Sequence, residues 1–279
     1  MKRVWIEASL NGPWGRERQP LIPLTVDEIV AEGIAVARAG CAIVHVHAYD
    51  ERTGKQHDDW SIYARIIEGI RAQVDVIVYP TIPLASASRR FAHVEELARR
   101  GLLEWTVLDP GSVEFVRFDR LNEGFTYQNA LGDILDGMQL AHSFGLHPGF
   151  AIYEPGFTRL GAALAASCKT PAPIYRFMFS HEFAWGFPPQ ETYLDAHRAL
   201  LDDVAPGARW MVAGLGVDIR PLIPKAVACG GGVRIGLEDA PWGSRLHNLD
   251  WFEDAIARVR AAGGEPASSA EIRAALSGG

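Results

Sequence analysis

Two histidines, His45 and His47, stand at alternate positions in a short β-branched run that begins at Ile43. Alternate residues of a β-strand project to the same side, so both imidazoles are expected to meet near the C-terminal end of that strand. Two imidazoles at this spacing suit a metal ion. Two buried, hydrogen-bonded histidines are the alternative for an isolated pair, so a further ligand has to decide between them.

That further ligand is expected from a second β-branched run near the C-terminus, where Arg234, Gly236 and Glu238 fall on one face. Ionisable groups inside a closed barrel carry a severe desolvation cost unless they are paired or bound to a charge. A set of His45, His47 and Glu238 leaves a coordination position open, as catalytic zinc sites do, so we predict about one zinc ion per chain. A plain ion pair between Arg234 and Glu238 is the alternative.

Asp239 follows Glu238 directly, where the chain leaves the predicted strand. Its carboxylate can face the mouth of the site as a general base. A neighbouring cation would lower its pKa while burial would raise it, and the sequence does not fix the balance. A carboxylate in a loop or at a helix end is the alternative for Asp239.

These residues require strands that converge on one point, and the chain offers them. Apolar β-branched or aromatic runs alternate with segments of helical period, which indicates βαβ units around a parallel sheet. The predicted strands are 3–10, 42–48, 74–80, 103–108, 148–153, 173–179, 208–213 and 232–237. The predicted helices are 26–39, 59–72, 91–100, 129–144, 157–168, 190–204, 218–229, 250–262 and 268–276.

Eight evenly spaced units without a GxGxxG after the first strand favour a closed (β/α)8 TIM barrel, an α/β fold, over an open doubly wound sheet. No linker-like stretch divides the chain, so residues 1–279 are predicted to form a single domain. Two long connections, 109–128 and 180–189, follow the fourth and sixth strands on the face that carries barrel chemistry, and both are candidate substrate-covering loops.

The composition of the chain argues against nucleic acids and membranes as partners. A formal charge of −7 over 279 residues, 48 % of them hydrophobic, is that of a globular protein without a basic footprint for nucleic acid. The apolar run after Met1 is too short for a signal peptide or a membrane span, so we expect a cytoplasmic protein with no membrane partner. Three widely spaced cysteines fit reduced core thiols better than a disulfide framework.

Four stretches together carry a resemblance to a known family: residues 8–12 (ASLNG), 39–47 (AGCAIVHVH), 210–216 (WMVAGLG) and 230–239 (GGGVRIGLED). They resemble the β-keto acid cleavage enzymes, whose founding member is the 3-keto-5-aminohexanoate cleavage enzyme, over nearly the whole chain. The resemblance implies a zinc-dependent barrel enzyme, usually a homotetramer. Its expected reaction joins a β-keto acid with acetyl-CoA as co-substrate and gives acetoacetate and a new acyl-CoA.

On this resemblance His45, His47 and Glu238 match the zinc ligands, Asp239 the base, and Arg234 the arginine beside it. Thr81 stands in Tyr79–Pro83, where relatives carry a Ser/Thr-Gly-Gly turn, and keeps a hydroxyl there as a third candidate catalytic residue. Substrate-binding candidates are Glu7 and Glu154, from their places on the first strand and beyond the fifth, and Tyr49 and Asp109, from positions where relatives carry other residues.

Two rival functions remain open at the level of sequence. A hydrolase or aldolase could use the same His2Glu metal site without CoA, and dependence of turnover on acetyl-CoA separates the two. A metal-containing binding barrel without turnover is the other, motivated by the altered residues at Tyr49 and Tyr79–Pro83. Ligand binding without turnover across a panel of keto acids would favour it.

Overall fold

Eight parallel strands form one sheet in a computed structural model that describes residues 1–84 and 89–277. Their order is β6-β3-β2-β13-β12-β11-β10-β7, and β6 and β7 at the two ends contact each other, so the sheet closes almost completely into a barrel. The strands are β2 (Ile6–Ser9), β3 (Ile43–Val46), β6 (Ile77–Pro80), β7 (Trp105–Val107), β10 (His147–Ile152), β11 (Ile174–Phe179), β12 (Arg209–Gly214) and β13 (Gly232–Ile235). The predicted (β/α)8 barrel is confirmed.

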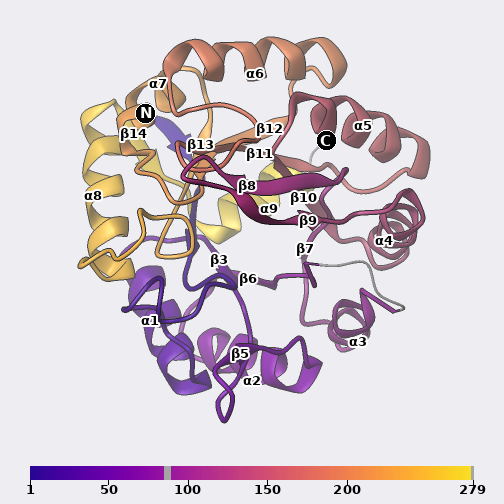
Figure 1. Cartoon of the computed structure of the whole chain (residues 1–279), viewed down its shortest axis with the longest axis vertical. Helices are drawn as coiled ribbons and strands as arrows, with labels where there is room; N and C mark the ends of the chain where they lie inside the picture. Colours follow the sequence, from indigo (N-terminus) through magenta and orange to yellow (C-terminus); the bar gives the residue numbers. More distant parts are fainter. Residues whose placement is uncertain (85–88, 278–279) are drawn as a thin grey trace.

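Helices surround the strands on the outside, except that the last one, α9, lies behind the strands in the view of Figure 1. They are α1 (Val26–Arg38), α2 (Trp60–Arg71), α3 (Ala92–Arg99), α4 (Leu131–Phe144), α5 (Pro155–Cys168), α6 (Glu191–Val204), the 3-10 helix η1 (Arg220–Leu222), α7 (Ile223–Ala228), α8 (Asn248–Ala261) and α9 (Ser269–Ser277). The start of α1 has the capping box expected from its sequence, because Thr25 accepts a hydrogen bond from the Glu28 amide and Glu28 accepts one from the Thr25 amide. Within the described residues, no helix is long and apolar enough to cross a membrane.

Most of the predicted strands are shorter in the structure, and the first and the last are cut at identifiable residues. The first, predicted over 3–10, is interrupted at Trp5: β1 (Lys2–Val4) pairs instead with β14 (Gly264–Pro266) in a separate two-stranded sheet. The last, predicted over 232–237, ends at Ile235 because Gly236 has a φ of +152°. A Cβ at Gly236 would lie 2.1 Å from the Ser9 carbonyl oxygen, so only glycine permits this close approach of β13 to β2.

The connection over residues 109–128 contains an antiparallel hairpin that the sequence analysis treated as a loop. Its strands are β8 (Val113–Arg117) and β9 (Arg120–Tyr127), and Figure 1 shows them crossing the end of the barrel. Backbone hydrogen bonds also join the hairpin to residues 182–184, which follow β11. The two long connections therefore form one structure over the C-terminal ends of the strands. A smaller hairpin, β4 (Tyr49–Asp50) with β5 (Lys55–Gln56), follows β3.

Candidate active site and metal centre

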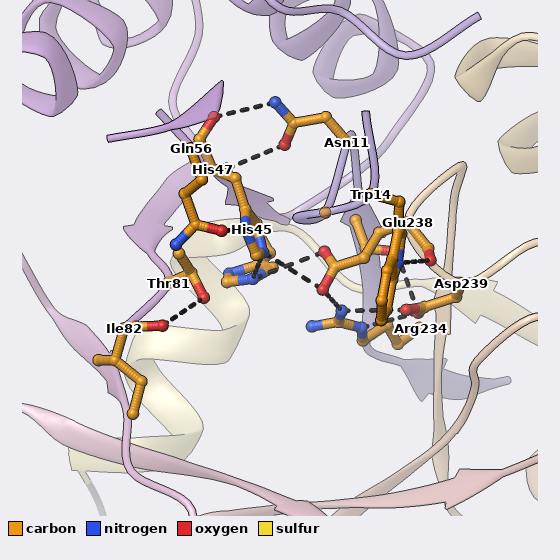
Figure 2. A network of polar contacts seen from close by, with 12 residues as sticks. Asn11, Trp14, His45, His47, Gln56, Thr81, Ile82, Arg234, Glu238 and Asp239 are labelled. Atoms are coloured by element: carbon orange, nitrogen blue, oxygen red, sulfur yellow. Dashed lines mark hydrogen bonds and ion pairs between the residues drawn. The ribbon is translucent and has the colours of Figure 1, made fainter. Parts of the chain in front are cut away.

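His45, His47 and Glu238 converge at the C-terminal ends of β3 and β13, as predicted (Figure 2). The Nε2 atoms of the two imidazoles lie 3.2 Å apart, and each is 3.4 to 3.6 Å from an oxygen of Glu238. All three side chains are buried. Glu238 reaches the histidines from the turn that follows β13, because this turn begins at Gly236 directly above Ser9. The three offer one ligand atom each within 4.8 Å of one another, which is the spacing of a metal site.

A chain of hydrogen bonds behind His47 fixes its tautomer. Gln56 donates from Nε2 to both oxygens of Asp58, at 3.1 Å each, so its Oε1 must be the atom that faces His47 Nδ1 at 2.9 Å. An amide oxygen only accepts, so His47 Nδ1 carries the hydrogen and its Nε2 keeps a lone pair directed at Glu238. Asn11 fixes the backbone of His47 by bonding both its N–H and its C=O at 2.9 Å.

Arg234 connects the carboxylates of the site. Its Nε and Nη2 donate to Asp239 at 2.8 and 3.1 Å, its Nη2 lies 2.8 Å from Glu238, and its Nη1 donates to Glu7 at 3.0 Å. Ser9 adds a hydrogen bond to Asp239 at 3.0 Å. The register of β13 on β2 pairs Arg234 with Glu7 directly. One guanidinium thus holds three carboxylates that would otherwise repel one another.

The electrostatics give the ligands different protonation states. Burial lowers the pKa of His45 well below its usual range, so its ring stays neutral and can offer a lone pair. Burial alone would raise the pKa of Glu238, but the Arg234 guanidinium holds it well below its usual range. For Asp239 the balance is reversed: burial outweighs Arg234 and raises the pKa to about 6. Adjacent carboxylates therefore differ, one fixed as an anion and one able to exchange a proton near neutral pH.

A second buried arginine, Arg176 on β11, lies beneath these residues and was missed by the sequence analysis. Its Nη1 contacts Glu7 at 3.3 Å and the Tyr79 hydroxyl, and Tyr79 donates to Glu7 at 2.6 Å. The Nε and Nη2 of Arg176 and the Oε2 of Glu7 have no hydrogen-bond partner within the described residues. A charged residue inside the otherwise apolar run of β11 was the signal that could have identified it.

A cavity of about 60 Å³ at the C-terminal end of the barrel is lined by the charged and metal-ligating side chains of the site: His45, His47, Arg176, Arg234, Glu238 and Asp239. Thr81 and Asp109 also line it, and Asp109 accepts hydrogen bonds from the Tyr127 hydroxyl at 2.7 Å and from the Ala151 amide at 2.6 Å. Burial raises the pKa of Asp109 despite these donors. The rest of the lining is mainly apolar or aromatic, including Trp14, Ile82, Leu84, Val107, Phe115, Tyr127, Ala151, Tyr153, Met178 and Leu215. The cavity has room for roughly four to six water molecules, the size of a small organic acid.

The structure therefore gathers most of the predicted site residues around one cavity: His45, His47, Thr81, Asp109, Arg234, Glu238 and Asp239. It does not bring Glu7, Tyr49 or Glu154 to that lining. Glu7 lies below the cavity, bound to Arg234 and Arg176. The Tyr49 hydroxyl donates to the Gly12 carbonyl oxygen, and Glu154 accepts from the Gly186 amide at 3.0 Å. In the structure these three side chains serve the fold around the site.

The chain is similar in sequence to a known protein family. The family model of the beta-keto acid cleavage enzymes matches residues 3–277. The chain is 24 % identical to a 3-dehydrocarnitine:acetyl-CoA trimethylamine transferase of Rhizobium meliloti, covering 99 % of this chain and 96 % of that protein. It is 26 % identical to a 3-oxoadipate:acetyl-CoA acetyltransferase of Cupriavidus necator, covering 84 % and 79 %. Among solved structures, the fold is similar to that of ObcA in complex with oxaloacetate, with a TM-score of 0.72, 14 % identity, and coverage of 92 % of this chain and 67 % of that one.

Proposed function

Because the chain belongs to the beta-keto acid cleavage enzyme family, we propose that it is a zinc-dependent enzyme that joins a β-keto acid with acetyl-CoA. The products are acetoacetate and a new acyl-CoA. The relatives named above act with acetyl-CoA, which favours this reaction over a hydrolase or aldolase on the same site. The single observation that carries the proposal is the convergence of two imidazoles and one carboxylate on one side of a cavity that also contains Asp239.

The residues present fit a zinc ion. Glu238 is fixed as an anion, yet its Oε2 is buried without a hydrogen-bond partner within the described residues. The tautomer of His47 and the neutral ring of His45 supply lone pairs at the same place. Two histidines and a glutamate are a donor set of catalytic zinc sites, which keep a position open for substrate. Zinc held there would act as a Lewis acid that stabilises negative charge developing on the oxygens of the keto acid.

The charges around the cavity support the same assignment. The carboxylates of Glu7, Glu238 and Asp239 face the guanidinium groups of Arg176 and Arg234, so this cluster, counted without Asp109 on the other side of the cavity, has one formal negative charge in excess. A divalent cation would turn this into one positive charge in excess. A keto acid carries one negative charge, so the loaded site and its substrate would together be neutral, which lowers the cost of burying both.

Asp239 is the proposed general base. It would take the proton from C2 of the keto acid, between the carbonyl and carboxylate carbons, and C2 would then form a bond to the acetyl carbon of acetyl-CoA as the CoA thiolate leaves. The thiolate adds to C3, the original keto carbon, the C2–C3 bond breaks, and C2 recovers a proton from Asp239. Atoms balance: acetoacetate contains C1, C2 and the acetyl group, and the remainder of the acid becomes the new thioester. The pKa of about 6 suits a group that must take and return a proton.

Arg234 and Thr81 are proposed to position the reacting groups. Arg234 holds Asp239 through two N–H groups, which orients this carboxylate and keeps it apart from Glu238. Among the described residues, the Thr81 hydroxyl makes only a long hydrogen bond of 3.4 Å, to the Ile82 carbonyl oxygen, so it can turn to donate to the substrate carboxylate. Asp109 is proposed to contact the variable end of the keto acid, since it and the aromatic side chains line the same cavity.

A panel of β-keto acids with neutral, acidic and basic side chains tests the proposal. Each acid is incubated with acetyl-CoA, Zn²⁺ and the protein, and mass spectrometry measures acetoacetate and the new acyl-CoA. We expect at least one acid to give both products in equal amounts. Cleavage that proceeds equally well without acetyl-CoA would instead establish the hydrolase or aldolase, and binding of acids without any turnover would establish the non-catalytic barrel.

A further inference from the structure

The site cavity has a neighbour that the proposed chemistry has not used. A second cavity of about 160 Å³ shares two walls with it, the side chains of Trp14 and Phe115. Three arginines, Arg18, Arg117 and Arg120, line the rest of this second cavity together with one carboxylate, Glu123, with Gly124 and with two further aromatic side chains. We call it the arginine groove. It lies beside the β8–β9 hairpin that crosses the end of the barrel (Figure 1).

The groove gathers three positively charged side chains on a protein whose formal net charge is −7. Within residues 1–84 and 89–277, Arg18 forms no ion pair; its guanidinium lies 5.6 Å from the Trp14 ring centre and 5.9 Å from that of Trp242. An arginine stacked on aromatic rings keeps its N–H groups free at the edge of the plane. The groove therefore has an exposed guanidinium whose hydrogen-bond donors are available to a ligand.

The other two arginines are held only by surface ion pairs. Arg117 lies 2.9 Å from Asp119 and 3.3 Å from Glu182, and Arg120 lies 3.3 Å from Glu123 with 57 % of its side chain exposed. An exposed pair such as that of Arg120 contributes little to stability. The Arg120 side chain can therefore exchange its carboxylate for a phosphate, to which a guanidinium donates two parallel hydrogen bonds. Arg117 donates to Asp119 through both Nε and Nη2 at 2.9 Å, so it keeps that partner.

The size of the site cavity indicates which ligand needs the groove. At about 60 Å³ the cavity can hold a small acid, but not the nucleotide of acetyl-CoA. That nucleotide carries several phosphate charges and an adenine ring. It must bind close enough to the site cavity for the thioester arm of acetyl-CoA to extend from it to the proposed zinc ligands. The arginine groove adjoins the cavity at Trp14 and Phe115 and offers guanidinium groups together with aromatic faces such as Phe125, which is 39 % exposed.

We propose that the arginine groove binds the phosphate-bearing nucleotide of acetyl-CoA, with the thioester arm passing Trp14 and Phe115 into the site cavity. This inference rests on the proposed function for its ligand. Arg18 would be the principal phosphate contact, because it is the groove arginine that gives up no ion pair on binding. Arg120 would add a contact from the hairpin. The hairpin thereby serves both substrates, closing over the acid on one side and holding the nucleotide on the other.

Steady-state kinetics of Arg18→Gln and Arg120→Gln test the inference, with Arg260→Gln as the matched control. Arg260 on α8 is 58 % exposed, forms a comparable surface pair with Glu265 on β14, and lies outside the groove. We expect the KM for acetyl-CoA to rise roughly three- to tenfold for each groove variant, the loss of a charge-assisted contact at a wet surface. The KM for the keto acid is expected to stay the same, and Arg260→Gln is expected to match the wild type.

The acetyl thioester of N-acetylcysteamine, which has no phosphates, separates nucleotide binding from other effects. With this donor the groove variants are expected to match the wild type, because the contact they remove does not exist. Equal KM values for acetyl-CoA in the groove variants and the control would overturn the inference. So would an equal penalty with both thioesters, since the arginines would then act on something other than the nucleotide.

A binding experiment keeps the inference independent of turnover. Adenosine 3′,5′-bisphosphate is titrated calorimetrically into the wild-type protein, the two groove variants and Arg260→Gln, with inorganic phosphate as the comparison ligand. We expect the bisphosphate to bind more tightly than phosphate, and more weakly to the groove variants than to the control. Absence of turnover with every keto acid would refute the proposed function, whereas bisphosphate affinity that is the same in all four proteins would refute the groove.

Discussion

Replacing Asp239 by asparagine separates proton transfer from metal binding. Asp239 is one residue from the proposed ligand Glu238, but its oxygens are held by Arg234 at 2.8 and 3.1 Å and by Ser9 at 3.0 Å, outside the His2Glu set. Asparagine keeps the size of the side chain and one oxygen acceptor, but it cannot take the proton from C2. We expect turnover to fall roughly 100-fold to 10,000-fold, the usual contribution of a positioned base.

That loss corresponds to about 3 to 5 kcal/mol of activation free energy. The effect on folding is expected to be smaller, about 1.5 to 3 kcal/mol for one lost charge-assisted hydrogen bond, because Arg234 keeps Glu238 and Glu7 as partners. The assays are initial rates with saturating acetyl-CoA, zinc content by elemental analysis, and unfolding in urea. Zinc content and affinity for the keto acid are expected to match the wild type.

Glu238→Gln is the comparison variant, since it changes the neighbouring carboxylate in the same way. It removes the charged ligand, so zinc content and turnover are expected to fall together. A fully active Asp239→Asn protein would refute the assignment of the base. An Asp239→Asn protein that loses zinc as Glu238→Gln does would show that the roles of the two carboxylates are wrongly assigned.

Three further predictions concern residues away from the reacting atoms. Gln56→Leu removes the acceptor that fixes the His47 tautomer, so zinc affinity measured by chelator competition is expected to fall roughly 10-fold to 100-fold; unchanged affinity would contradict that role. His197 on α6 is buried against Phe177, and burial lowers its pKa to about 4. As the pH falls from about 6.5 to 4, His197 is therefore protonated in the unfolded chain but stays neutral in the folded one. This difference lowers the free energy of unfolding by up to about 3 kcal/mol. In His197→Phe this part of the acid dependence of urea unfolding is expected to vanish, and a curve parallel to the wild type would show that His197 does not stay neutral. Finally, the family resemblance implies a homotetramer by light scattering, and α4 and α5 expose apolar side chains that an interface would cover, those of Leu131, Leu135, Phe144 and Leu160; a monomer mass at micromolar concentration would remove this prediction.

The sequence predicts this fold well because each βα unit repeats the same local pattern. The spacing of His45 and His47 is a property of one strand, and the position of Glu238 follows from barrel closure, so the proposed ligands could be identified from the chain. The roles of Glu7 and Tyr49 could not be identified from the sequence. Glu7 is engaged by Arg234 through the register between β13 and β2, and the Tyr49 hydroxyl by a carbonyl in a distant loop, both of which depend on tertiary contacts.

The hairpin over the barrel could have been predicted in part. The run Val113–Arg117 combines β-branched and aromatic residues with two charged ones, a composition that is compatible with a partly exposed strand. What the sequence could not supply is the direction in which the hairpin folds, since this depends on its backbone hydrogen bonds to residues 182–184. The cavity walls formed by Phe115 and Tyr127, and the arginine groove behind them, follow from that direction.

The most direct test of the central claim measures metal and turnover on the same samples. Wild-type protein and the His45→Ala/His47→Ala variant are stripped with a chelator, titrated with Zn²⁺, and analysed for bound zinc and for acetoacetate formed from a β-keto acid and acetyl-CoA. We predict about one zinc per wild-type chain, almost none in the variant, and turnover that returns in proportion to the zinc bound. Equal metal content in the two proteins, or turnover by the stripped wild type, would contradict the account.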